Sequence, residues 1–116
     1  MDIGILGHGT YIPSGRMTAK DIALASGIPE DIIIRKFGIK EKPIPGKDDT
    51  TARMGIVAAE RALKNAGIGA SEIDLVIWCG AQHKDYPCWL AGLYVANELG
   101  AVKAWSFDME AMCGSM

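Results

Sequence analysis

The chain has 116 residues, of which 49% are hydrophobic, and a formal net charge of −2 at pH 7. This size and apolar content suit one globular unit with a hydrophobic core. The charge excludes the basic surface that nucleic acids or acidic membranes require, and no apolar run reaches the length of a membrane span. Three cysteines without a C-x-x-C pair and two unclustered histidines argue against a zinc site.

The first residues alternate apolar and small side chains and predict a strand from Ile3 to Gly9. Its glycines are spaced G-x-x-G-x-G, not G-x-G-x-x-G, so they indicate close backbone approach instead of a dinucleotide loop. The segment has no basic n-region and only a short apolar run. No signal peptide is therefore predicted, and the cytoplasm is the expected location.

Two short helices are predicted next. The first begins after Thr18, an N-cap residue with Asp21 three residues later, and stops at Gly27. The second has Pro29 at its first position and Gly38 after its end. The stretch 39–49 is predicted to be a loop because it combines prolines, a glycine and charged residues.

The clearest helix is predicted over residues 50–67, with Gly67 closing it. Small and apolar residues recur on one of its faces, which allows close packing against a neighbour. These residues are Ala52, Gly55, Ile56, Ala59, Leu63 and Ala66.

The rest of the chain predicts two apolar strands around one more helix. Residues 75–79 form a continuous apolar run, typical of a strand covered on both faces. A loop over 81–89, a helix over 90–100 and a strand over 102–107 follow. This order predicts an α/β fold with crossover connections, and residues 1–116 are assigned to one domain.

The cysteines differ in their expected roles. Cys79 lies in the apolar strand and is expected to be buried packing, and Cys88 is expected to be packed or exposed in a loop. Cys113 follows the last strand, where α/β sheets place ligands and where the amides of a following helix can stabilise a thiolate. Spacing alone leaves the nucleophile and packing interpretations of Cys113 equally open. Three residues follow it, so the sequence is interpreted as interrupted within an element.

The chain resembles β-ketoacyl-acyl-carrier-protein synthase III, a condensing enzyme of the thiolase-like superfamily. The matching stretches are "IGILGHGTYIPSGRMT", "IRKFGIKEK", "TTARMGIVAAERALKNAGI", "IDLVIWCG" and "WSFDMEAMCGSM". The resemblance implies the amino-terminal part of a thiolase-like fold, with a mixed sheet and crossover helices. It also maps the nucleophilic cysteine of that family onto Cys113.

The resemblance implies an acyltransferase of fatty acid biosynthesis. An acyl group passes from coenzyme A or acyl carrier protein to Cys113, and a decarboxylating malonyl thioester then attacks the acyl-cysteine. Coenzyme A is a substrate here, and no cofactor or metal is expected. The family's histidine and asparagine have no match, and His8 and His83 are expected to be surface or loop residues. The chain alone is therefore expected to be inactive, and the complete enzyme to be a homodimer.

Four further residues are implied to bind substrate. Ile32 falls where many members have an adenine-stacking tryptophan, and Arg35 and Lys36 fall near the family's phosphate-binding arginine. The alternative for both cations is charge complementarity at a helix end. Tyr86 matches an aromatic residue that reaches the partner's acyl pocket across a dimer. Its alternative is packing on its own subunit.

Two other functions stay open. A 3-hydroxy-3-methylglutaryl-coenzyme A synthase shares the cysteine, but it uses a glutamate after the preceding strand, where this sequence has Gly80, Ala81 and Gln82. The other alternative is a non-catalytic half-subunit that needs a complementary chain.

Overall fold

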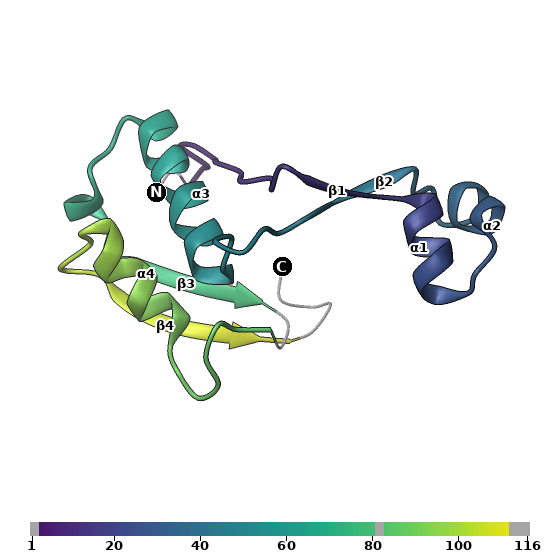
Figure 1. Ribbon diagram of the computed structural model, residues 1–116. Helices are drawn as coiled ribbons and strands as arrows, with labels where there is room; N and C mark the ends of the chain where they lie inside the picture. The colour runs from purple at the N-terminus through teal and green to yellow at the C-terminus, as the bar shows by residue number, and fades with distance from the viewer. Residues whose placement is uncertain (1–2, 81–82, 112–116) are drawn as a thin grey trace. The chain divides into compact units, whose positions relative to one another are not determined.

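The computed structural model describes residues 3–80 and 83–111 and divides the chain into two compact units. The small unit comprises residues 12–49, and the large unit comprises residues 1–11 and 50–116. Figure 1 labels the helices and strands of both.

The small unit holds a two-stranded antiparallel sheet and two helices. In chain order these elements are β1 (Gly15–Thr18), α1 (Ala19–Ser26), α2 (Glu30–Arg35) and β2 (Glu41–Ile44). The sequence predicted a loop over 39–49, where β2 lies, and predicted no strand where β1 lies. Each strand has only four residues, and Pro43 in β2 cannot donate a hydrogen bond to a ladder, so neither strand carries a strong sequence signal.

The ends of α1 follow the sequence prediction. The Asp21 amide donates to Thr18 Oγ1 at 3.2 Å, and the Thr18 amide donates to Asp21 Oδ2 at 2.8 Å. These hydrogen bonds from Thr18 hold the pKa of Asp21 below its ordinary value. Gly27 ends the helix with φ 73°, a left-handed conformation that suits glycine. Pro29 is the N-cap of α2 and not its first residue, and Ile33 of α2 is fully buried.

The large unit contains a parallel two-stranded sheet, β3 (Leu75–Gly80) and β4 (Trp105–Glu110), joined by helix α4 (Ala91–Leu99). A parallel pair needs such a crossover, so the α/β prediction is confirmed. Helix α3 (Thr51–Ala66) and a 3-10 turn, η1 (Ala70–Glu72), precede β3. None of the helices in the described part of the chain is long and apolar enough to span a lipid bilayer.

Helices α3 and α4 pack on one face of the β3–β4 sheet. A Cβ on Gly55 of α3 would lie 2.8 Å from the Trp78 ring, and one on Gly92 of α4 would lie 2.6 Å from Ser106 Oγ. Both glycines therefore allow a close approach between helix and strand.

The other face of this sheet is exposed, contrary to the prediction of a strand covered on both faces. The described residues supply helices to one face only, so exposure alternates along both strands. Cys79 is consequently exposed, and its predicted burial is wrong. The exposed apolar residues of this face are Leu75, Ile77, Trp105, Phe107 and Met109.

Residues 3–11 form no strand, although the sequence predicted one from Ile3 to Gly9. Their carbonyls bind side chains of α3 instead: Asn65 donates to the His8 carbonyl at 2.9 Å, and Arg61 donates to the Thr10 carbonyl at 2.6 Å. Alternation of side chains encodes an extended backbone, but a strand also needs a neighbouring strand, and within the described residues no strand pairs with Ile3 to Gly9. His8 is exposed, as the sequence predicted.

Candidate functional site

The candidate site lies at the carboxyl ends of β3 and β4. Because the two strands are parallel, both carboxyl ends meet at one edge of the sheet, where α/β folds place ligands. Residues 83–90, which follow β3, contain no helix or strand. We call this segment the β3–α4 loop. Cys113, the predicted nucleophile, lies outside the described residues.

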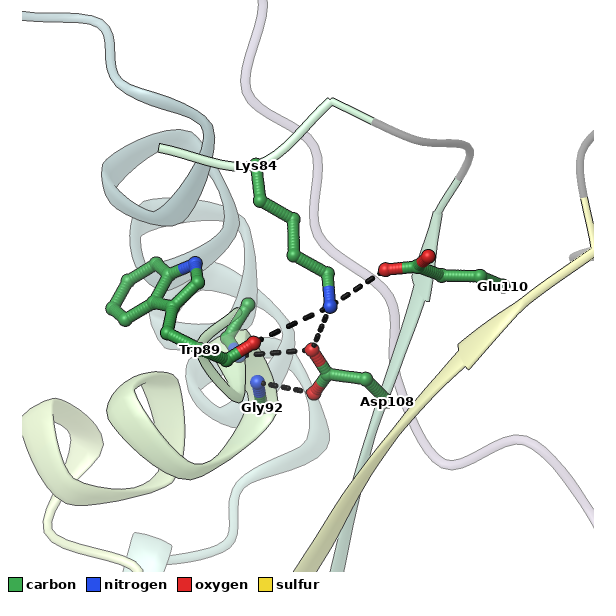
Figure 2. A network of polar contacts seen from close by, with 6 residues as sticks. Lys84, Trp89, Gly92, Asp108 and Glu110 are labelled. Atoms are coloured by element: carbon green, nitrogen blue, oxygen red, sulfur yellow. Dashed lines mark hydrogen bonds and ion pairs between the residues drawn. The ribbon is translucent and has the colours of Figure 1, made fainter. Parts of the chain in front are cut away.

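Lys84 of the β3–α4 loop reaches across to the end of β4 (Figure 2). Its ammonium nitrogen lies 2.7 Å from Asp108 Oδ2 and 2.6 Å from Glu110 Oε1, and it donates to the Trp89 carbonyl at 3.4 Å. The Lys84 side chain is 15% exposed and that of Asp108 is 5% exposed. Both carboxylates raise the pKa of Lys84, so its charge is well stabilised.

Asp108 also caps helix α4. Its two carboxylate oxygens accept hydrogen bonds from the Ala91 amide at 2.9 Å and the Gly92 amide at 2.8 Å (Figure 2). Burial raises the pKa of this carboxyl, but the hydrogen bonds from Lys84, Gly92 and Ala91 outweigh burial and hold the pKa below its ordinary value. Asp108 is therefore a charged, fully engaged structural carboxylate.

Asp85 caps helix α3 in the same manner. Its carboxylate accepts from the Thr51 amide at 2.7 Å and the Ala52 amide at 2.8 Å. Burial raises its pKa, whereas the hydrogen bonds from Ala52, Thr51 and Thr50 lower it more strongly, so the pKa lies below its ordinary value. Adjacent residues of the β3–α4 loop thus bind two different parts of the large unit.

A cavity of about 400 Å³ opens beside this network. The β3–α4 loop forms most of its wall, and Glu110 supplies the end of β4. The lining residues are His83, Lys84, Tyr86, Pro87, Cys88 and Glu110. It is a recess of binding-site size at the edge of the sheet that the sequence analysis selected.

Tyr86 projects from the β3–α4 loop and is 65% exposed. Its ring packs edge-on against Trp89 at 5.3 Å between centroids, and Trp89 in turn contacts Tyr94 at 5.2 Å. Cys88 is exposed and has a left-handed backbone, with φ 61°. His83 is exposed in the loop, as predicted.

The remaining substrate-binding candidates lie in the small unit. Ile32 and Arg35 belong to α2, and Lys36 is its C-cap. Arg35 is 75% exposed and donates to Asp31 at 2.6 Å, one helical turn earlier. This pair fits the helix-end alternative for Arg35, whereas Lys36 is exposed. The substrate-binding roles of all three stay predictions.

Sequence reasoning missed Lys84, Asp85 and Glu110 as site-forming residues. Asp108 directly follows the predicted strand over 102–107 and was given no role there. The usable signal was a pair of opposite charges in the loop after one apolar strand and two acidic residues at the end of the next apolar strand. Within the described residues, no group of three histidine, cysteine, aspartate or glutamate side chains gathers as a metal site would require.

The fold is that of the thiolase-like condensing enzymes. 3-Oxoacyl-acyl-carrier-protein synthase III from Aquifex aeolicus superposes on the chain with a TM-score of 0.87 and 29% identity, over 96% of this chain and 35% of that one. No family model matches the chain.

The predicted resemblance to β-ketoacyl-acyl-carrier-protein synthase III is confirmed. The chain is 32% identical over 109 residues to the enzyme of that name from Rhizobium johnstonii, which covers 94% of this chain and 33% of the relative. It is also 37% identical over 117 residues to the hydroxymethylglutaryl-CoA synthase of Thermococcus kodakarensis, covering 98% of this chain and 31% of the relative. The chain spans about a third of the length of the curated relatives it matches.

Proposed function

We propose that this chain is part of an acyltransferase that performs a decarboxylative Claisen condensation through an acyl-cysteine on Cys113. The observation that carries the proposal is the similarity to β-ketoacyl-acyl-carrier-protein synthase III over 94% of the chain. Strand β4 supports it, because it runs parallel to β3 and ends three residues before Cys113 in the sequence.

In the proposed reaction, the Cys113 thiolate attacks the carbonyl of an acyl thioester and expels the donor thiolate. A malonyl thioester then loses carbon dioxide, and the resulting carbanion attacks the acyl-cysteine carbonyl. The carbon–sulfur bond breaks and returns the thiolate. The cysteine thereby divides one difficult condensation into two easier steps.

The acyl-cysteine is the direct test. The native protein that contains these residues is incubated with an acyl-coenzyme A. Its intact mass is measured by mass spectrometry before and after a malonyl thioester is added. We expect an acyl adduct that disappears on condensation and is absent from Cys113→Ser. Cys88→Ser is the matched control, because Cys88 is exposed near the same strand ends, and it should retain the adduct. An adduct that persists in Cys113→Ser would refute the proposal.

The proposed donor is a thioester of coenzyme A or acyl carrier protein, recognised at its phosphates by Arg35 and Lys36. Reversing both charges to glutamate should raise KM for the donor several-fold with little change in kcat. The control reverses Lys20 and Lys47, two exposed lysines of the same small unit. Equal KM values in the two double variants would leave helix-end complementarity as the role of Arg35 and Lys36.

We also propose that the complete enzyme is a homodimer. Trp105 in β4 is 81% exposed, and the apolar face of the β3–β4 sheet needs a cover. Tyr86, which projects at 65% exposure, fits the proposed reach into a partner's acyl pocket. Light scattering coupled to size exclusion should give twice the monomer mass, and a monomer would contradict this.

A hydroxymethylglutaryl-CoA synthase is the second candidate, favoured by the 37% identity over 98% of the chain. The absence of a carboxylate in the sequence directly after β3 speaks against it. An assay with acetyl-CoA and acetoacetyl-CoA as substrates distinguishes the two candidate functions. Hydroxymethylglutaryl-CoA as product would establish the second candidate, whereas release of carbon dioxide from a malonyl thioester supports the first.

The non-catalytic alternative predicts neither product. Activity that appears only after a complementary chain is added would support it.

A further inference from the structure

The amino-terminal segment lies directly against the second half of α3 (Figure 1). A Cβ on Gly7 would lie 2.7 Å from the Ala66 amide nitrogen, and a Cβ on Gly9 would overlap the Ala58 carbonyl oxygen. A larger residue at either position would require the segment or the helix to shift. The backbone of the segment is therefore in contact with the helix.

Two side chains of α3 fasten this segment. Arg61 donates to the Thr10 carbonyl at 2.6 Å, and its guanidinium carbon lies 5.6 Å from the centroid of the Tyr11 ring. Asn65 donates to the His8 carbonyl at 2.9 Å. A carbonyl and an aromatic ring carry no full charge, so these contacts fix the position of Arg61 without neutralising it.

A cavity of about 340 Å³ opens between the segment and the helix. Its described lining contains basic and uncharged polar residues but no carboxylate. The lining residues are His8, Gly9, Thr10, Arg61, Lys64 and Asn65. Pockets for small molecules span roughly 300–1,000 Å³, so this cavity has the size of a ligand site.

The two cations of this cavity lack an acidic partner. Arg61 and Lys64 are three residues apart on α3 and so share one face of the helix. Among the described residues, no carboxylate lies within ion-pair distance of either, whereas Arg35 and Lys84 each have one. Glu60 lies one turn before Lys64 but lines a different cavity. An anion in the cavity would relieve the repulsion between the two cations.

We propose that this cavity binds the phosphate group of a small phosphorylated molecule, held by Arg61 and Lys64. The guanidinium presents a planar fork of donors that matches phosphate oxygens, and the ammonium adds a second charge. The Thr10 carbonyl takes only one of the five N–H groups of Arg61.

The proposed site is separate from the site at the strand ends and does not depend on the function of Cys113. Asp85 of the β3–α4 loop binds the Ala52 amide at the start of α3, and Lys64 lies roughly 18 Å further along this helix. The two cavities share none of their described lining residues.

The alternative role for Lys64 is charge complementarity at a helix end. Lys64 lies in the last turn of α3, where a cation interacts favourably with the helix dipole. That role affects the stability of the protein but not its affinity for phosphate, so the two roles can be measured separately.

The test is isothermal titration calorimetry of the native protein with glycerol 3-phosphate and, separately, with inorganic phosphate at constant low ionic strength. Lys64→Gln should weaken binding about fivefold. Lys64→Arg keeps the charge and should bind within about twofold of wild type. Tighter binding of glycerol 3-phosphate would support a phosphate ester as ligand, and equal affinities would support free phosphate. Binding of neither would overturn the inference.

The matched control is Lys103→Gln, which removes an exposed lysine of the large unit, just before β4, and changes the net charge equally. It should leave both affinities unchanged. Equal weakening in Lys64→Gln and Lys103→Gln would show a general effect of charge and overturn the inference.

Arg61→Gln should weaken binding more than Lys64→Gln does, but it also removes the hydrogen bond to Thr10. If Arg61→Gln does not fold, Lys64→Gln still decides, because the Lys64 side chain has no hydrogen bond or ion pair within the described residues. A Lys64→Gln protein with lower stability and unchanged phosphate affinity would leave only the helix-end role and overturn the inference.

Discussion

The two units of the molecule hold their helices in different ways. In the small unit, Asp21 and Asp31 bind residues three and four positions away along the chain. In the large unit, Asp85 binds amides 33 and 34 residues away, and Asp108 binds amides 16 and 17 residues away. These two carboxylates of the small unit find their partners within one helix or at its cap, whereas Asp85 and Asp108 bind their partners only after long loops have closed.

Burial separates the units further. The Arg35–Asp31 pair has side chains 75% and 51% exposed, while the Lys84–Asp108 pair is 15% and 5% exposed. Exposed pairs contribute little because water and salt screen them, but removing one partner of a buried pair leaves an uncompensated charge. Polar contacts of the large unit should therefore matter more to stability than those of the small unit.

Asp108→Ala should give the largest effect. It removes the cap of α4 and one of the two carboxylates that neutralise Lys84, so we expect a loss of about 3 kcal/mol in the free energy of unfolding. Urea denaturation measures it. Asp74→Ala, at an exposed position just before β3, is the matched control and should change stability by less than about 0.5 kcal/mol. Similar losses in both variants would show that the contacts of Asp108 add no stability beyond that of an exposed carboxylate in the same unit.

Gly92→Ala should follow. The added Cβ would lie 2.6 Å from Ser106 Oγ, 3.1 Å from Asp108 Oδ1 and 3.3 Å from the Phe107 carbonyl oxygen, so the Ser106 side chain, the Asp108 cap or helix α4 must shift. We expect a loss of about 2 kcal/mol by the same denaturation measurement. The control is Gly4→Ala, where no atom lies within 4 Å of the added Cβ. A Gly92→Ala protein as stable as wild type would show that α4 can shift without a loss in the free energy of unfolding.

Acid should lower the free energy of unfolding of the large unit by less than Asp108→Ala or Gly92→Ala does. A protonated Asp108 keeps its shape and can keep some of its hydrogen bonds. Its folded-state pKa is lowered, so its contribution is present above the unfolded pKa of about 3.9 and is lost as pH falls through the folded value. We expect the free energy of unfolding to decrease below about pH 4, with a shallower decrease in Asp108→Asn. If the free energy of unfolding falls equally below pH 4 in wild type and in Asp108→Asn, the acid sensitivity does not come from Asp108.

Asp31→Ala should give the smallest effect, because it removes only an exposed pair within one helix of the small unit. We expect a loss of about 0.5 kcal/mol and a decrease of about 2 °C in Tm, reduced further in 1 M salt. Thermal circular dichroism measures it. A loss as large as that of Asp108→Ala would mean that burial does not separate the units.

The sequence predicted those features whose causes lie within a few residues. Thr18 and Asp21 specify the start of α1, and Gly67 and Gly100 specify the ends of α3 and α4. The strand predicted from Ile3 to Gly9 is wrong because strand formation depends on a partner that alternation cannot reveal. β1 and β2 were missed for the same reason, since their pairing joins residues 23 to 29 positions apart.

The candidate site was predictable in location but not in detail. The carboxyl ends of the two apolar strands could be expected to converge, and they do. The partners of Lys84 and Asp85 could not be inferred, because a charged loop residue is by default a solvated one. The roles of Ile32, Arg35, Lys36, Tyr86 and Cys113 stay predictions.

We expect the β3–α4 loop to tolerate little change in length, unlike most loops, which accept insertions and deletions. Lys84 and Asp85 are neighbours with opposite charges; Lys84 binds two carboxylates of β4, and Asp85 binds two amides at the start of α3. Deleting one residue just before them would draw both side chains out of reach together, and exchanging them would place like charges against β4. Relatives that change the length of this loop should therefore lack both the α3 cap made by Asp85 and the ion pairs made by Lys84, which makes loop length a marker of how this edge of the sheet is assembled.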